Sequence, residues 1–213
     1  METTYRRGQT EYALWGLYGR GKARQSVPRA FRNRLKKLLD ADRVREMPNS
    51  EANAAPFAFS EEAPGGTGVD SAFAAFDVTC LAYALEMVGV GFKPSEIVFL
   101  LRHIRGTLHH LYDEMVDEDR LPSRTRASNT NAELCTFLLI KRVDVSGDYL
   151  EQTTKGPLFI QPKVCRGHQE LTQAFTAFGQ SQRSLFVLEL AWPAALVREQ
   201  LAKAPLIKRG VKS

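Results

Sequence analysis

Apolar residues in this chain recur with two different spacings, and the change between them falls near residue 130. Upstream, as in 94–115, they recur every three or four residues, which is the spacing of an amphipathic helix. Downstream they form short runs at 134–145, 156–164 and 183–192, which are typical of strands. The spacing therefore predicts an α+β fold, with a mostly helical N-terminal part and a small C-terminal α/β module of about three strands and two helices.

Two helices and a loop are expected in the first seventy residues or so. The first helix covers 10–20, with Thr10 as its N-cap. The second begins near Pro28, because proline suits the first turn of a helix. The segment 46–70 is rich in Pro, Gly, Ala and Asn, which predicts a loop or a short β-hairpin.

Two further helices are expected between this loop and residue 120. One begins with Asp77 as its N-cap, and Gly89 or Gly91 closes it. The other is long and begins at Pro94 or Ser95. Acidic residues follow at its end, where we expect them to lie in solvent.

The domain organisation follows from these elements. Residues 1–120 are predicted to form a helical domain, 121–132 have the composition of a linker, and 133–213 form the C-terminal module. In that module the elements follow in the order β-β-α-β-α, with the last helix after Trp192. Dimerisation, ligand sensing and partner docking stay open as roles of this module. Its edge strands could pair between the subunits of a homodimer.

Charge is distributed unevenly along the chain, whose formal net charge is +5. The first 50 residues hold 12 Lys and Arg against 5 Asp and Glu, whereas the rest of the chain is slightly acidic. The excess of positive charge therefore lies in the first quarter. This asymmetry indicates a polyanionic partner, and nucleic acid before a membrane, because no hydrophobic anchor accompanies it.

The predicted helix 28–40 has one side for a core and another crowded with cations. Its apolar positions form one stripe: Phe31, Leu35, Leu38 and Leu39. The opposite side carries the residues expected to meet DNA: Arg29, Arg32, Asn33, Lys36 and Lys37. The loop before the helix adds three cations, expected to contact the DNA backbone: Arg20, Lys22 and Arg24. Clustered cations repel one another unless an anion lies nearby, and a phosphate backbone supplies one.

No pattern in the chain indicates catalysis, a metal or a cofactor. The three cysteines are isolated, and Cys165 with His168 is a single ligand pair, whereas structural zinc takes four ligands. The glycine-rich segment 64–68 lacks the Gly-Lys-Ser/Thr of a phosphate-binding loop. Without a nucleophile motif, an apolar membrane span or a signal peptide, we expect a non-enzymatic cytoplasmic protein.

The segment 26–105 resembles the DNA-binding part of MerR-type regulators. The positions that carry the resemblance are Asp77, Leu81, Leu85, Gly91, Phe92, Glu96, Ile97 and Leu100. The resemblance implies a winged helix-turn-helix, with helix 28–40 as recognition helix, 46–70 carrying the wing, and 11–20 as the helix before the turn. The chain departs from the family in two places. It lacks the usual Gly-Val-Ser turn at the start and the long C-terminal dimerisation coiled coil, so the family's dimerisation and DNA-bending mechanisms do not carry over.

These observations predict a transcription regulator or accessory protein that binds double-stranded DNA through a basic recognition helix. The alternative is a non-catalytic adaptor whose basic N-terminal face docks an acidic protein. The two differ in their response to salt, because each phosphate that a protein neutralises adds a slope near −0.9 to log K against log salt.

Overall fold

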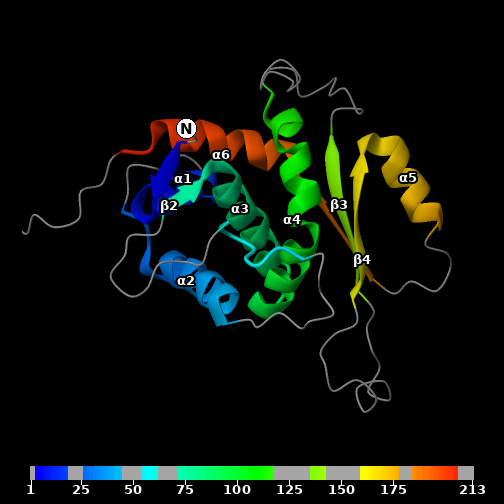
Figure 1. The fold of residues 1–213 in the computed structure, drawn as a ribbon, viewed down its shortest axis with the longest axis horizontal. Helices are drawn as coiled ribbons and strands as arrows, with labels where there is room; N and C mark the ends of the chain where they lie inside the picture. Colours follow the sequence, from blue (N-terminus) through cyan, green and yellow to red (C-terminus); the bar gives the residue numbers. More distant parts are fainter. Residues whose placement is uncertain are drawn as a thin grey trace, which may run out of the picture. The chain divides into compact units, whose positions relative to one another are not determined.

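The structure, a computed structural model, describes residues 3–18, 26–44, 54–61, 72–117, 135–142, 159–177 and 184–205. Within these residues the chain is α+β, with six helices, a two-stranded antiparallel sheet and a three-stranded antiparallel sheet (Figure 1). The predicted fold class is confirmed at this level. The chain divides into two compact units: Met1–Tyr112 together with Pro193–Ser213, and Asp113–Trp192.

The first unit contains two short strands and most of the helices. Its elements are β1 (Thr4–Arg6), α1 (Arg7–Tyr18), α2 (Arg29–Val44), β2 (Ala72–Ala74), α3 (Ala75–Gly89), most of α4 (Pro94–Val116) and most of α6 (Ala191–Lys203). α3 is buried along almost its whole length, whereas α2 buries only one side and lies at the margin of this unit in Figure 1. The expected starts of α2 near Pro28 and of α4 at Pro94 or Ser95 are confirmed, with α2 beginning at Arg29 and α4 at Pro94.

The predicted N-cap of the first helix is wrong. α1 begins at Arg7, and the side-chain oxygen of Gln9 accepts a hydrogen bond from the N–H of Arg6 at 3.1 Å. Thr10 is buried inside the helix instead. The three residues before α1 pair as a strand, so the helix begins where that strand ends.

The predicted role of Asp77 is also wrong in position. The N-cap of α3 is Ala74, and Asp77 occupies the third helical position. Its carboxylate accepts a hydrogen bond from the N–H of Ala74 at 2.9 Å, so it still serves a backbone donor at the helix start. The other end agrees with the prediction, since Gly91 has a φ of +94° in the turn after α3.

Strand pairing in the first unit was not predicted. β1 pairs antiparallel with β2, with Tyr5 opposite Phe73. The described part of the predicted loop or hairpin, 54–61, contains neither helix nor strand, and β2 pairs with β1 rather than with it. The rest of 46–70 lies outside the described residues.

The second unit is built on the predicted strands. β3 (Thr136–Arg142) lies between β4 (Phe159–Arg166) and β5 (Ser184–Glu189), antiparallel to both. α5 (Gly167–Ala177) packs on β4 and β3 over a small core: Phe137, Leu139, Cys165, Leu171 and Ala174. Along the chain the predicted order β-β-α-β-α is confirmed, although most of the last helix belongs to the first unit and not to this module.

α6 begins slightly earlier than predicted. The carboxylate of Glu189 accepts hydrogen bonds from the N–H groups of Ala191 and Trp192, so Trp192 lies in the first turn rather than before the helix. From Pro193 onward the chain belongs to the first unit, where a Cβ on Gly16 of α1 would lie 2.5 Å from Oε1 of Gln200. The predicted boundaries at 120 and 133 lie within 118–134, outside the described residues.

Candidate functional site

α2 buries one narrow side and leaves the rest of its surface exposed. This inner side consists of Phe31, Leu35, Leu38 and Asp42. These positions are four, three and four residues apart, so they form one line along the helix. The predicted apolar stripe is therefore confirmed, with Leu39 half-buried at its margin.

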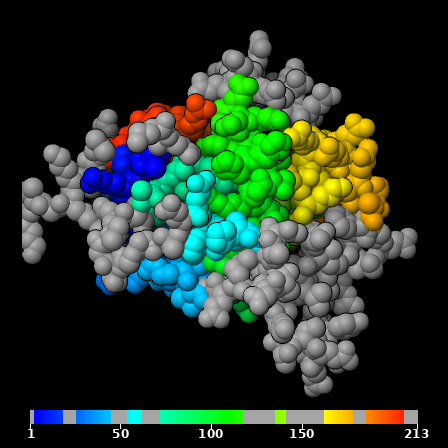
Figure 2. Space-filling model, in the orientation of Figure 1, coloured from blue at the N-terminus to red at the C-terminus, as the bar shows by residue number. Residues whose placement is uncertain are grey.

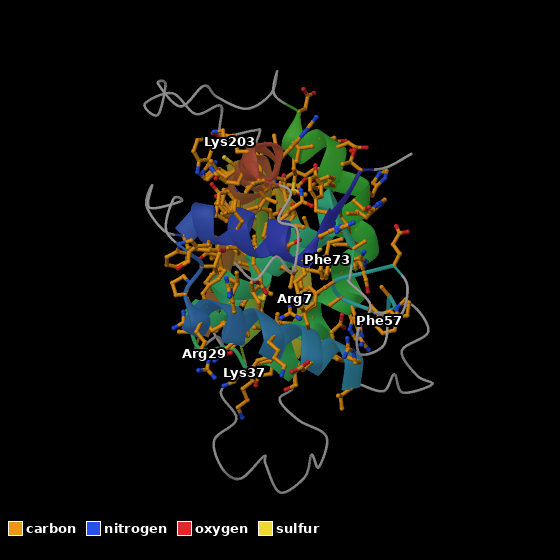
Figure 3. The ribbon with its side chains drawn as sticks, turned by 90° about the vertical axis from the view of Figure 1, so that its left-hand side faces the viewer. Arg7, Arg29, Lys37, Phe57, Phe73 and Lys203 are labelled. Atoms are coloured by element: carbon orange, nitrogen blue, oxygen red, sulfur yellow. The ribbon has the colours of Figure 1, made fainter. Side chains whose placement is uncertain are left out.

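The outer side of α2 carries the predicted DNA-contacting residues that the structure describes: Arg29, Arg32, Asn33, Lys36 and Lys37. All five side chains are exposed. Figure 3 shows Arg29 and Lys37 at the surface of α2, on the face where α1 and α2 lie side by side. Among the described residues, Arg29, Lys36 and Lys37 have no ion-pair partner. Their charge is therefore not neutralised by this part of the chain.

Two further cations on α2 were missed by the sequence prediction. Arg34 and Arg43 are exposed as well, at the flanks of the outer side. The helix carries six Arg and Lys residues against two Asp residues. Because Asp42 is buried, Asp40 is the one acid of α2 that faces solvent. The exposed surface of α2 is thus strongly positive.

Arg32 differs from the other cations because an acidic residue on α1 holds it. Oε2 of Glu11 lies 3.3 Å from Nε of Arg32, and Oε1 of Glu11 lies 3.0 Å from Nε of Arg7. Arg7 lies on α1 at the edge that faces α2 (Figure 3). The sequence prediction missed both Glu11 and Arg7. The spacing of Arg7 and Glu11, four residues apart in one helix, could have indicated their pairing.

The predicted backbone-contacting residues Arg20, Lys22 and Arg24 lie outside the described residues. Their contribution to the surface stays a prediction. The candidate site consists of the outer side of α2 and the neighbouring edge of α1.

A buried ion pair fixes the far end of α2. The carboxylate of Asp42 lies 2.9 Å from Nε of Arg102 on α4, and both side chains are almost fully buried. Arg102 also donates to the backbone carbonyl of Asp42, which caps the end of the helix. The backbone N–H groups of Ala58 and Phe59 donate to the same carboxylate, at 3.0 and 3.2 Å. This arrangement binds α2, α4 and the segment 54–61 together, and Figure 2 shows that segment at the surface between the two helices.

A second buried arginine repeats this arrangement one turn further along α4. Nη2 of Arg105 lies 2.6 Å from the carboxylate of Asp77, and Nη1 donates to the carbonyl of Ala58 at 2.8 Å. Burial raises the pKa of Asp77, although the ion pair with Arg105 opposes this shift. Burial also raises the pKa of the Cys80 thiol, to about 12. These buried charges have partners inside the protein, so we assign them to structure rather than to ligand binding.

The described residues contain no metal centre. No group of three or more His, Cys, Asp or Glu side chains among them could hold an ion. Cys165 and His168, the ligand pair noted in the sequence, have different surroundings. Cys165 is buried in the core of the second unit, and the ring of His168 packs edge-on against Phe137, 5.1 Å between centroids. No described helix is long and apolar enough to cross a membrane.

The comparisons with known proteins give no relative for this chain. No protein-family model, no curated protein and no solved structure matches it.

Proposed function

We propose that this protein binds double-stranded DNA through the outer side of α2, as a non-enzymatic transcription regulator or accessory DNA-binding protein. One observation carries the proposal: Arg29, Lys36 and Lys37 of α2 are exposed and have no described ion-pair partner. The buried acid of this helix, Asp42, is already paired with Arg102. A polyanion supplies the missing partner.

The distribution of charge on α2 supports a phosphate backbone as that polyanion. Like charges three or four residues apart on a helix, such as Arg29, Arg32 and Lys36, destabilise it in the absence of an anion. Regularly spaced phosphates relieve this repulsion, and phosphate contacts fix the position of a protein on the duplex. The proposal therefore explains why the protein tolerates a helix with this charge.

The shape of α2 supports insertion into the major groove. A recognition helix must be exposed around most of its circumference, and α2 buries a single line of residues. Arg29 and Asn33 lie one turn apart in the N-terminal half, opposite the inner side, where they suit guanine and adenine edges respectively. Asp40, which would repel phosphates, lies in the C-terminal half. We propose that the N-terminal half of α2 faces the bases.

In its finer form, the proposal is that the first unit is a winged helix-turn-helix, as the resemblance to MerR-type regulators implies. Helices α1 and α2 precede the segment 54–61, and α3 and α4 follow it, which is the order that the resemblance implies. The segment 54–61 contains no Lys or Arg and exposes Glu61, so we do not assign it a phosphate contact. Dimerisation, sensing or partner docking by the second unit is likewise a proposal.

Fluorescence anisotropy of a random 30-base-pair duplex, titrated with the protein at two salt concentrations, tests the proposed function. We expect binding that weakens steeply with salt, with a slope near −0.9 for each neutralised phosphate. Unlabelled duplex should displace the labelled one. Absence of binding at low salt would overturn the proposal and favour an acidic protein as the partner of this surface.

A further inference from the structure

Glu11 lies at the border of the proposed DNA-binding surface and contacts two of its cations. Its carboxylate reaches the Nε atoms of Arg7 and Arg32, at 3.0 and 3.3 Å. The side chain of Glu11 is only 14% exposed, whereas that of Arg32 is 52% exposed. The acid is therefore held in place by the protein, and the arginine is the partner that can move.

We infer that Glu11 is an internal competitor for DNA phosphate, which lowers the affinity of the α1–α2 edge for duplex. This inference rests on the proposed function. In the free protein, Glu11 offsets the repulsion between Arg7 and Arg32. When a duplex approaches, the same carboxylate repels its phosphates. It also occupies one N–H group of each guanidinium, which could otherwise donate to a phosphate oxygen.

The arrangement also divides the arginines and lysines of α2 into two groups. Arg29, Lys36 and Lys37 have no described ion pair to break before they contact phosphate, whereas Arg32 has one. Both ion pairs of Glu11 are partly exposed, and such pairs contribute little to stability. Removing the charge of Glu11 should thus change binding more than folding.

The substitution Glu11→Gln tests this inference with the same 30-base-pair duplex. It frees one positive charge, so we expect binding about eightfold tighter at 0.1 M salt and a salt slope steeper by about 0.9, the value of one added phosphate contact. The matched control is Glu170→Gln, which removes one negative charge from an exposed position on α5, outside the proposed DNA-binding surface. The control should change affinity far less.

A mutant cycle locates the effect. In a background that carries both Arg7→Gln and Arg32→Gln, Glu11→Gln should lose most of its gain, because both guanidinium groups that it frees are absent. Unchanged or weaker binding by Glu11→Gln would overturn the inference while the proposed function stands, provided that the wild type binds. If the wild-type protein does not bind duplex at all, the proposed function fails and the inference fails with it. A thermal melt of each variant shows whether the fold is intact.

Discussion

The two sides of α2 use charged residues in opposite ways. On the inner side, Asp42 is buried and satisfied by Arg102 and by two backbone N–H groups. On the outer side, Arg29, Lys36 and Lys37 are exposed and lack described ion pairs. Both sides belong to one helix of 16 residues, so local composition does not explain the difference.

This difference separates charge that stabilises the fold from charge that we propose binds DNA. A buried charge must find its partner within the fold, because an unpaired one costs several kcal/mol. An exposed charge has no such requirement, and its unmet interaction is available to a partner molecule. Changes on the inner side should therefore affect stability, and changes on the outer side should affect binding.

The largest expected effect on stability comes from Asp42→Ala. This change removes the carboxylate that pairs with the buried Arg102 and the acceptor for the N–H groups of Ala58 and Phe59. We expect the free energy of unfolding to fall by about 3–5 kcal/mol, measured by urea denaturation. Asp40→Ala, two residues away on the exposed surface of the same helix, is the control and should change it by less than about 0.5 kcal/mol. Equal effects of the two changes would contradict the distinction between the sides.

A comparable but smaller loss is expected from Leu35→Ala. Leu35 is 2% exposed in the middle of the inner side, so the change leaves a cavity. Substitutions of this kind cost about 2–5 kcal/mol, depending on how far the site collapses. The neighbouring change Lys36→Ala alters an exposed residue and should leave the melting temperature almost unchanged. An unchanged melt of Leu35→Ala would show that the stripe does not face a core.

The smallest effect concerns Tyr18, whose ring packs against Phe31 of the inner side, 6.3 Å between centroids. Its hydroxyl donates to the carbonyl of Ala82 at 2.9 Å, so Tyr18→Phe should cost about 1 kcal/mol at neutral pH. Burial, followed by the nearby charge of Glu86, raises the pKa of Tyr18 above its ordinary value of 10. As pH rises above 10, the unfolded state loses this proton before the folded state does, so the stability of the wild type falls.

Urea denaturation across the alkaline range measures this dependence. We expect the free energy of unfolding of Tyr18→Phe to fall less with pH above 10 than that of the wild type. Parallel curves for Tyr18→Phe and the wild type would show that Tyr18 ionises as easily in the folded protein as in the unfolded one.

Local periodicity predicted most elements of this fold. The stripe Phe31, Leu35 and Leu38 and the three strands of the second unit were found because hydrophobic spacing is a local property. Helix starts were less predictable. The sequence predicts Thr10 and Asp77 as N-caps, but the structure places both inside their helices, because α1 and α3 begin directly where β1 and β2 end.

Contacts between distant segments could not be predicted from spacing. Asp42 and Arg102 are 60 residues apart, and Glu11 and Arg32 lie on different helices. A clue existed for the first pair, because Asp42 continues the apolar stripe of a basic helix and therefore requires a buried partner. Nothing local identified Arg102 as that partner, or Glu11 as the acid beside Arg32.

The most direct test compares duplex binding by the wild type with that of Arg29→Ala, Arg32→Ala and Lys36→Ala combined. A matched control removes three exposed cations elsewhere: Lys93, Lys163 and Arg166. Anisotropy at low salt should show that the α2 variant, with an unchanged thermal melt, loses at least about a hundredfold in affinity, because three cationic contacts to the duplex are removed. The control should retain most of its binding. Wild-type affinity in a folded α2 variant, or an equal loss in the control, would contradict the assignment of α2 as the DNA-binding helix.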